Sequence, residues 1–186
     1  MSKIKTIVID PPWKFDGGGN RAASVHYDTV KHSEIPPLCI DALSNYQINE
    51  DAHCYIWVVN NHLDQGLILM EKLGFKYITN IIWVKNSIGM GRYFRGKHEI
   101  CLFGRRGKGL KARTKSNSIP SVFEGKKRKH SQKPEEFYEM VEARSQPPYL
   151  ELFSRHTRPG WTMWGNEIGK LDNNETHACK PDNKMI

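Results

Sequence analysis

The sequence predicts a single doubly wound α/β domain with a mostly parallel sheet. Three observations favour this fold class. Short apolar runs rich in β-branched and aromatic residues recur along the chain, amphipathic helical patterns lie between them, and 186 residues suffice for one domain with a real core. Sheets of this class bind their ligands at the carboxyl ends of the strands.

The first half of the chain contains a strand–helix–strand pattern. A helix is predicted over 62–74, with Gly74 where the helix ends, and its apolar face is expected to consist of Leu63, Leu67, Met70 and Leu73. This pattern predicts a βαβ unit with a right-handed crossover. The strands expected in this half are residues 5–9, 53–59, 77–85 and 99–104.

The second half begins with a segment rich in Gly, Lys, Arg and Ser, in which only SIPSVFE (118–124) suggests a short strand. A serine cap and a proline precede a helix predicted over about 135–144, and strands are expected at 149–153 and 160–166. We expect one domain over residues 1–170 and a polar, flexible tail over 171–186.

Positive charge is concentrated in the middle of the chain. Residues 85–133 contain 15 Lys and Arg but only two acids, whereas acids outnumber bases in the remainder. A charge run is usually only a solvated surface. Here aromatic residues and glycines are interleaved with it, which favours a nucleic-acid partner for a recognition segment at about 86–132. The aromatic residues are Tyr93, Phe94, Phe103 and Phe123.

Several classes of protein fit the sequence poorly. The four cysteines lie far apart, which predicts reduced thiols, and neither cysteines nor histidines show metal-ligand spacing, so no metal is expected. No apolar run approaches the roughly 20 residues of a membrane span, and the first residues do not resemble a signal peptide. We therefore expect a cytoplasmic protein without a membrane partner.

Asp10-Pro11-Pro12-Trp13 follows the first predicted strand. Two prolines remove two N–H donors, so the preceding carbonyls are expected to point outward beside the Asp10 carboxylate. Two acceptors and an indole suit a planar aromatic ring that carries an amino group: the Asp10 carboxylate and the Pro11 carbonyl would accept its N–H bonds, and Trp13 would stack on its face. The alternative is a rigid turn with Trp13 packed in the core.

This DPPW motif resembles the target-base motif of amino-methyltransferases that modify adenine N6 or cytosine N4. Its tryptophan form, with further segments between Ile7 and Ile168, resembles the family of the 70-kDa catalytic subunit of mRNA N6-adenosine methyltransferase. The matching segments are YIWVVN (55–60), NIIWVK (80–85), HSQKPEEFYEMVE (130–142), LELFSR (150–155) and PGWTMWGNE (159–167). The resemblance implies a Rossmann-like, S-adenosylmethionine-dependent methyltransferase with the β-permuted order of segments.

The resemblance also implies roles for single residues. For catalysis it implies Asp10, Pro11, Pro12 and Trp13. For the substrate it implies Trp57 near the base pocket and Lys85 at its rim, with Arg92 and Arg95 in the basic segment. For S-adenosylmethionine it implies Asp10, Lys133, Glu151, Arg155, His156, Asn166 and Glu167.

Glu151 and Lys133 have chemical reasons for their roles and also simpler alternatives. Glu151 at a strand's carboxyl end can accept both ribose hydroxyls, as acids so placed do in other nucleotide-binding sheets. Lys133 can meet the methionine carboxylate. The alternatives are a surface salt bridge for Glu151 and a solvated lysine at a helix start for Lys133.

We therefore expect methyl transfer from S-adenosylmethionine to adenine N6 in nucleic acid, with DNA favoured because compact bacterial and phage members look similar. The alternatives are the same reaction on RNA and a non-catalytic nucleic-acid-binding subunit. A homodimer or a partner subunit is also plausible for so small a chain, in a bacterial or phage-infected host cytoplasm. Two departures from the family stand out: the chain starts nine residues before Asp10, without the upstream cofactor segment of longer members, and the turn SRHTRPGW lacks the glycine-rich form.

Overall fold

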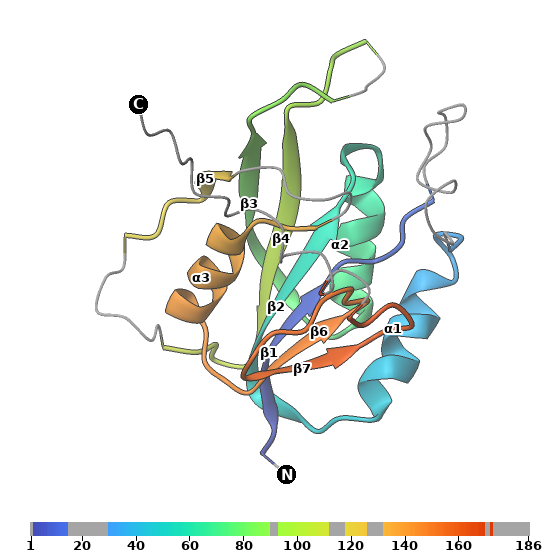
Figure 1. Ribbon diagram of the computed structural model, residues 1–186. Helices are drawn as coiled ribbons and strands as arrows, with labels where there is room; N and C mark the ends of the chain where they lie inside the picture. The colour runs from blue at the N-terminus through green and yellow to red at the C-terminus, as the bar shows by residue number, and fades with distance from the viewer. Residues whose placement is uncertain are drawn as a thin grey trace, which may run out of the picture.

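The computed structural model describes residues 2–14, 30–89, 93–111, 118–125, 132–169 and 172. They form a seven-stranded sheet with the order β5-β3-β4-β2-β1-β6-β7 (Figure 1). Each predicted strand is confirmed, although β2 begins at Ile48 rather than at residue 53. The strands are β1 (Ile4–Ile9), β2 (Ile48–Val58), β3 (Lys76–Lys85), β4 (His98–Arg106), β5 (Val122–Gly125), β6 (Tyr149–Leu152) and β7 (Trp161–Trp164).

The sheet is mixed, and β4 is the one described strand that runs against its neighbours. It pairs antiparallel with both β2 and β3, while the other neighbouring pairs are parallel. β2 and β3 therefore run in the same direction, as the predicted βαβ unit requires, but they are not adjacent. The hairpin that joins β3 to β4 folds β4 back into the place between them.

Helices cover both faces of the sheet, which confirms the doubly wound α/β class. α1 (Ile35–Ser44) and α2 (Leu63–Lys72), with the short 3-10 turn η2 (Asn60–His62), lie on one face, and α3 (Glu135–Arg144) lies on the other (Figure 1). Each face buries its own apolar cluster. The α1/α2 side includes Ile7, Ile9, Cys39, Ile56 and Leu69, and the α3 side includes Tyr55, Trp57, Trp83, Phe137 and Tyr138.

The helix α1 has no counterpart among the predicted elements. Its first turn contains Pro36 and Pro37, two residues that usually interrupt helices. In a first turn, however, proline loses no helical hydrogen bond because these N–H groups have no partner within the helix. The adjacent prolines were thus a possible start signal for a helix.

The predicted buried face of α2 is partly wrong. Gly66, Leu69 and Met70 are buried, whereas Leu63 and Leu67 are exposed. The reason is the close approach of the helix to the sheet at Gly66, where a Cβ atom would lie 2.2 Å from Cγ1 of Val58. The predicted end of the helix at Gly74 is confirmed, since this glycine has φ of +77°.

The register of β1 against β6 places two acidic residues at the same edge of the sheet. Val8 pairs with Glu151 and Ile9 with Leu152, and the Asp10 N–H donates to the Leu152 carbonyl at 3.4 Å. Asp10 and Glu151 therefore lie at the carboxyl ends of neighbouring parallel strands. None of the helices in the described ranges combines the length and the apolar character that crossing a membrane requires.

Candidate active site

The DPPW motif leaves β1 in a turn whose carbonyl groups are already engaged. The Pro11 carbonyl accepts the Trp13 N–H at 2.8 Å, and the Pro12 carbonyl accepts the Val30 N–H at 3.0 Å. The expectation that the carbonyls freed by the prolines face outward without competition is thus wrong for Pro11. A carbonyl oxygen has two lone pairs, so Pro11 retains one acceptor position for a ligand.

Trp13 is packed in the core rather than presented as a wall. Its side chain is only 5% exposed, and its indole N–H donates to the Trp57 carbonyl at 2.8 Å. The expected stacking face for a base is therefore absent from this conformation, and the alternative of a rigid turn with a core tryptophan describes it better. Burial of this large ring instead anchors the motif to β2.

Two histidines hold the backbone directly after this motif. The Nε2 atoms of His32 and His62 both donate to the Lys14 carbonyl, each at 3.0 Å. Their ring centroids lie 3.8 Å apart, and the His62 ring also stacks on Trp13 at 6.3 Å. Because a carbonyl cannot donate, each imidazole must carry a proton on Nε2 in this arrangement. The pair restrains the turn that begins with Asp10.

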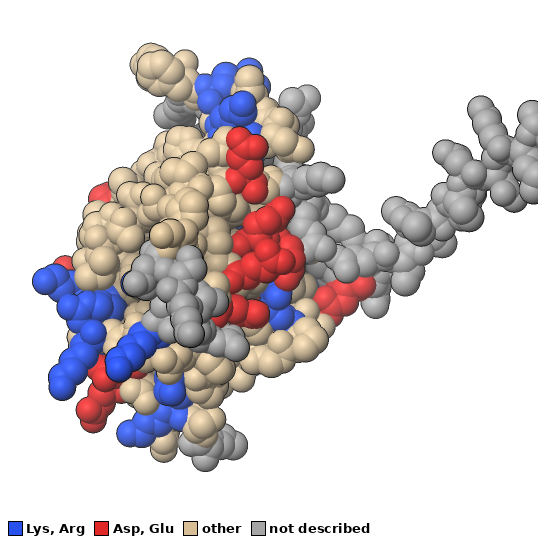
Figure 2. Space-filling view, turned by 90° about the vertical axis from the view of Figure 1, so that its left-hand side faces the viewer, with Lys and Arg blue, Asp and Glu red and all other residues tan. Residues whose placement is uncertain are grey.

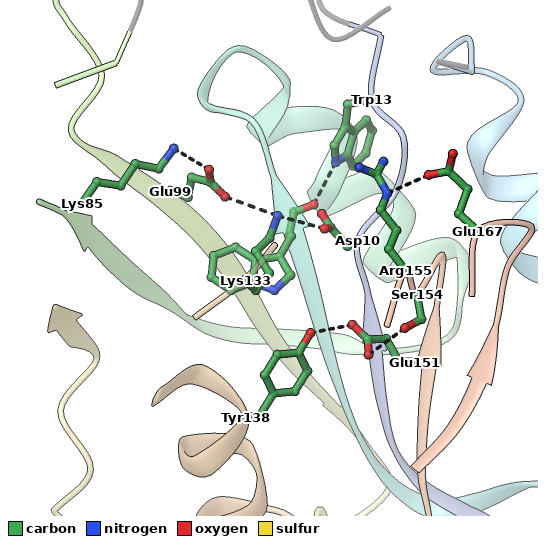
Figure 3. A network of polar contacts seen from close by, with 11 residues as sticks. Asp10, Trp13, Lys85, Glu99, Lys133, Tyr138, Glu151, Ser154, Arg155 and Glu167 are labelled. Carbon is green, nitrogen blue, oxygen red and sulfur yellow. Dashed lines mark hydrogen bonds and ion pairs between the residues drawn. The ribbon is translucent and has the colours of Figure 1, made fainter. Parts of the chain in front are cut away.

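Asp10 is the first member of a chain of ion pairs (Figure 3). Its Oδ2 lies 2.9 Å from Nζ of Lys133, and the same Nζ lies 3.4 Å from Oε2 of Glu99. Oε1 of Glu99 lies 2.5 Å from Nζ of Lys85. The four side chains come from the ends of β1, β3 and β4 and from the segment before α3. They form an alternating chain of charges, which we call the ion-paired network.

The position of Lys133 follows from the packing around it. Pro134 lies so close to Gly125, at the end of β5, that a Cβ atom at residue 125 would come within 2.8 Å of the proline ring. The Lys133 ammonium lies 4.9 Å from the Trp57 ring centroid, a distance that permits a cation–π contact. Lys133 is buried, so the alternative of a solvated lysine is wrong.

Mutual charge compensation decides the ionisation of this network. Burial alone would raise the pKa of Glu99, but the charges of Lys133 and Lys85 and their hydrogen bonds lower this pKa to about 2. Burial alone would likewise lower the pKa of Lys133, and the carboxylates of Asp10 and Glu99 raise it above its ordinary value instead. At neutral pH Glu99 and Lys133 are therefore both charged.

Glu151, at the same edge of the sheet, has a different environment. It is 3% exposed, and its Oε1 accepts the Tyr138 hydroxyl at 2.8 Å, while its Oε2 lies 3.3 Å from the Ser154 hydroxyl, which shares its one proton with the closer His156 carbonyl at 2.8 Å (Figure 3). No Lys or Arg pairs with it within the described part of the chain, which rules out the surface salt bridge there. Burial and the nearby charge of Asp10 outweigh the two hydroxyls and raise the pKa of Glu151 to about 7. We call this group the hydroxyl-bound carboxylate.

The turn after β6 brings β6 and β7 close together. Phe153 has φ of +64°, which is rare for a bulky residue, and the Ser154 N–H donates to the Trp164 carbonyl at 3.2 Å. A Cβ atom at Gly165 would lie 3.1 Å from the Phe153 Cα, and this residue has φ of +150°, so the approach favours glycine. The turn thus places the Ser154 hydroxyl between the His156 carbonyl and Glu151.

Most other predicted cofactor residues lie around this turn. Arg155 and Glu167 form an ion pair, with Nε and Oε2 3.0 Å apart (Figure 3). The His156 ring meets the Tyr138 ring edge to face at 5.3 Å, and Asn166 is exposed after β7. The structure therefore brings the predicted cofactor residues to one edge of the sheet, close to Asp10.

The predicted substrate residues divide into two groups. Trp57 and Lys85 lie at the ion-paired network, but Trp57 is buried beneath Lys133, and its indole N–H has no hydrogen-bond partner within the described ranges. Arg95 lies near the end of the β3–β4 hairpin, where its Nε donates to the Gly89 carbonyl at 2.8 Å. Arg92 lies outside the described residues.

Several residues of the site were not predicted from the sequence. They are Glu99, Tyr138, Ser154, His32 and His62. Glu99 had one usable signal, because it is one of two acids in a strongly basic segment. The other four carry no distinctive spacing, and only the fold brings them to Asp10 and Glu151. No cluster of three or more potential metal ligands occurs in the described ranges.

Comparison with known proteins agrees with this geometry. The MT-A70 family model matches residues 4–167, which is most of the chain. The chain belongs to the MT-A70 family. Its relatives include the Type II methyltransferase M.MunI of a Mycoplasma species, which is 26% identical over 98% of this chain and 80% of its own length. The match to the human N(6)-adenosine-methyltransferase catalytic subunit METTL3 is 26% identical over 98% of this chain and 30% of METTL3.

The MT-A70 relatives differ in how much of them the chain covers. An N(6)-adenosine-methyltransferase MT-A70-like protein of Arabidopsis thaliana is 29% identical over 90% of this chain but only 24% of its own length. The chain therefore spans about a quarter of the plant relatives that it matches, and most of M.MunI. The matched part contains both the ion-paired network and the hydroxyl-bound carboxylate.

Proposed function

We propose that this MT-A70 chain transfers a methyl group from S-adenosylmethionine to the N6 amine of adenine in nucleic acid, with DNA preferred to RNA. One observation carries the proposal. A carboxylate that a lysine holds in place, Asp10, adjoins a buried carboxylate without a cation, Glu151, at the ligand-binding edge of a doubly wound sheet. The first suits an amine that donates N–H bonds, and the second suits a ligand that donates hydroxyls.

The residues around Glu151 fit the parts of S-adenosylmethionine. A buried carboxylate bonded only to hydroxyl groups has acceptor capacity left for a ribose diol, and it gains stability when further donors arrive. Lys133 has one N–H beyond the two that face Asp10 and Glu99, and this N–H can meet the carboxylate of the methionine part. Arg155, His156, Asn166 and Glu167 surround the adjacent turn. When bound, S-adenosylmethionine supplies an activated methyl group.

The residues of the chain would orient the adenine amine. The lone pair of this amine is delocalised into the ring, which makes it a poor nucleophile. Asp10 accepts one N–H bond and the remaining lone pair of the Pro11 carbonyl accepts the other, which favours a tetrahedral nitrogen. Lys133 holds the Asp10 carboxylate in one orientation, and such positioning contributes up to about 7–11 kcal/mol in the best cases. The proton leaves late, from the nitrogen to an Asp10 carboxylate oxygen.

The preference for DNA rests on the resemblance to bacterial and phage members of the family. The chain resembles compact bacterial and phage members, and it covers most of a Type II methyltransferase but only about a quarter of the plant relatives. RNA adenosine is the alternative substrate, since several relatives are N(6)-adenosine-methyltransferases by name.

The proposal is tested with the full chain and S-adenosylmethionine that carries a radiolabelled methyl group. Single-stranded DNA, duplex DNA and RNA of one sequence are the substrates, and matched oligonucleotides with purine in place of every adenine are the control. We expect label on adenine-containing DNA and none on the control. Label on RNA alone would reverse the preference for DNA. No label on any adenine substrate, or no thermal stabilisation by S-adenosylmethionine, would favour a non-catalytic binding subunit.

A further inference from the structure

The β3–β4 hairpin ends in two aromatic side chains that pack against nothing described. Tyr93 is 103% exposed and Phe94 is 87% exposed, and neither ring stacks on another aromatic ring in the described ranges. Neighbouring exposed rings form a contiguous apolar surface, and such surfaces often mark binding sites in soluble proteins. These two side chains, which we call the aromatic tip, are therefore a candidate contact surface.

The two arms of the hairpin are hydrogen-bonded to each other below the tip. The Lys85 N–H donates to the Lys97 carbonyl at 2.8 Å, and the Gly89 N–H donates to the Gly96 carbonyl at 2.7 Å. Arg95 adds a third link, from its Nε to the Gly89 carbonyl at 2.8 Å. Tyr93 has φ of +57°, a strained conformation for a bulky residue. These hydrogen bonds join the two arms directly below the point from which the rings project.

The charge of the hairpin selects the kind of partner. Arg95 and Lys97 are exposed on the arm that follows the tip, and the acid on the same arm, Glu99, has both oxygens engaged by Lys85 and Lys133. Figure 2 shows Lys and Arg side chains gathered at the top of the molecule, where the hairpin extends in Figure 1, with acidic side chains below them. Positive charge beside flat rings is complementary to a strand of phosphates and bases.

The root of the hairpin is part of the candidate active site. Lys85 and Glu99, at the ends of β3 and β4, belong to the ion-paired network that reaches Asp10. Phe94 precedes Glu99 by five residues, so their Cα atoms lie at most about 18 Å apart. One strand of B-DNA rises 3.4 Å per nucleotide. The tip thus reaches a base within about five nucleotides of the root of the hairpin at Glu99, which Lys133 connects to Asp10.

We propose that Tyr93 and Phe94 form a wedge that stacks on bases of the nucleic-acid strand carrying the target adenine. This inference rests on the proposed function for the position of the target, while the stacking itself does not require transfer. The wedge supplies a sequence-tolerant contact, because every base has an aromatic face. It also holds the strand beside the site while the target adenine leaves the stack.

The test is a double variant, Tyr93→Ala with Phe94→Ala, in the full chain. Its matched control is Tyr77→Ala with Ile78→Ala, two exposed apolar residues at the other end of β3. Binding to fluorescein-labelled single-stranded and duplex DNA is measured by anisotropy from 50 to 200 mM salt. Oligonucleotides with 2-aminopurine at each of the five positions on either side of one adenine report stacking by fluorescence.

We expect the tip variant to bind between about fivefold and about a hundredfold more weakly, as loss of base–aromatic stacking predicts. The slope of log affinity against log salt stays unchanged, because no phosphate contact is lost, whereas Arg95→Ala with Lys97→Ala reduces this slope by about two. The 2-aminopurine response at one or more positions disappears in the tip variant alone, and its melting temperature equals that of the wild type.

Other outcomes separate the wedge from the proposed function. Unchanged binding and unchanged 2-aminopurine fluorescence would overturn the wedge even if the wild type methylates adenine. Weaker binding with an unchanged salt slope would support it even if no substrate is methylated. A tip variant that turns a dimer into a monomer in size-exclusion chromatography, without any effect on nucleic acid, would overturn it in favour of a protein interface.

Discussion

Two carboxylates near the same edge of the sheet are held in opposite ways. Glu99, in the ion-paired network, has a lysine on each oxygen, at 2.5 and 3.4 Å. Glu151, the hydroxyl-bound carboxylate, has a tyrosine and a serine hydroxyl in the corresponding places. The pKa of Glu99 is lowered to about 2, and that of Glu151 is raised to about 7.

The difference lies in the charge of the partners. The positive charges beside Glu99 balance its negative charge, whereas the hydroxyl groups beside Glu151 leave its charge unbalanced. Two lysine charges offset the cost of taking Glu99 out of water, so this group holds its neighbours in place. Two neutral hydroxyls offset that cost only in part for Glu151, and a ligand with further hydroxyl donors would lower it. Asp10 belongs to both regions, since it pairs with Lys133 and its charge contributes to the raised pKa of Glu151.

Removing the Asp10 carboxylate should have the largest effect, and it should affect methyl transfer much more than cofactor binding. We expect Asp10→Ala to reduce methyl transfer by about a thousandfold, within the range for a positioned acid–base side chain. S-adenosylmethionine binding by isothermal titration calorimetry should fall only modestly, because the ribose contact belongs to Glu151. Asp64→Ala on α2, an exposed acid far from Asp10 in sequence, is the control. Retained transfer with lost binding would contradict the assignment of both residues.

The raised pKa of Glu151 makes a specific prediction about stability and pH. Below its ordinary pKa of 4.5 this carboxyl is neutral in the folded and the unfolded protein, so its burial costs no charge. As the pH rises from 4.5 to about 7, this carboxyl ionises in the unfolded protein but stays protonated in the folded one, so the free energy of unfolding decreases by about 3 kcal/mol and then levels off. Glu151→Gln should remove this decrease in urea titrations from pH 4.5 to 8. If the free energy of unfolding depended on pH equally in the wild type and in Glu151→Gln, the raised pKa of Glu151 would be refuted.

The lowered pKa of Glu99 acts in the opposite direction and in another pH window. Its contribution to stability is present above pH 4.5 and is lost as the pH falls toward 2. Glu99→Gln should therefore flatten the acid side of the profile and leave the range from pH 4.5 to 8 unchanged. A change in the same window as that of Glu151→Gln would show that the two carboxylates share one environment.

Removing Lys133, the cation that Asp10 and Glu99 share, should leave Glu99 with less charge compensation, as in Glu151. We expect Lys133→Met to lower the free energy of unfolding by about 2 kcal/mol at pH 7, less than for a fully buried pair because Asp10 and Glu99 are partly exposed. The pKa of Glu99 should rise in a carbon-13 NMR titration. Lys72→Met, an exposed lysine on α2, should have almost no effect. An unchanged Glu99 pKa would contradict the network.

Removing one hydroxyl group from the surroundings of Glu151 should have the smallest effect on stability. Tyr138→Phe deletes the donor to Oε1 of Glu151 and should lower stability at pH 8 by about 1 kcal/mol. The pKa of Glu151 should rise further, since this hydrogen bond favours its ionised form. Tyr46→Phe is the control for loss of a tyrosine hydroxyl. A fall in the Glu151 pKa would show that the hydroxyl does not stabilise the carboxylate.

Local patterns predicted the local features of the fold well. Residues 135–144 form α3 with the bounds expected from the sequence, and Gly74 adopts the positive φ that ends a helix. Such features depend on neighbouring residues and on backbone geometry. The buried face of α2 was predicted less well, because Gly66 brings the helix close to Val58 and so decides which side chains remain exposed.

The sequence alone determined that Asp10 follows the first apolar strand of a doubly wound sheet and that Glu151 lies near the end of a later one. It also determined that the middle of the chain is basic. Only the tertiary structure decided that Trp13 is buried, that β4 lies between β2 and β3, and that Lys133 reaches Asp10 and Glu99 but not Glu151. The physical reason is that charge compensation and burial depend on side chains from strands far apart in sequence. Strand order and register bring those side chains within a few ångströms, and no local spacing encodes them.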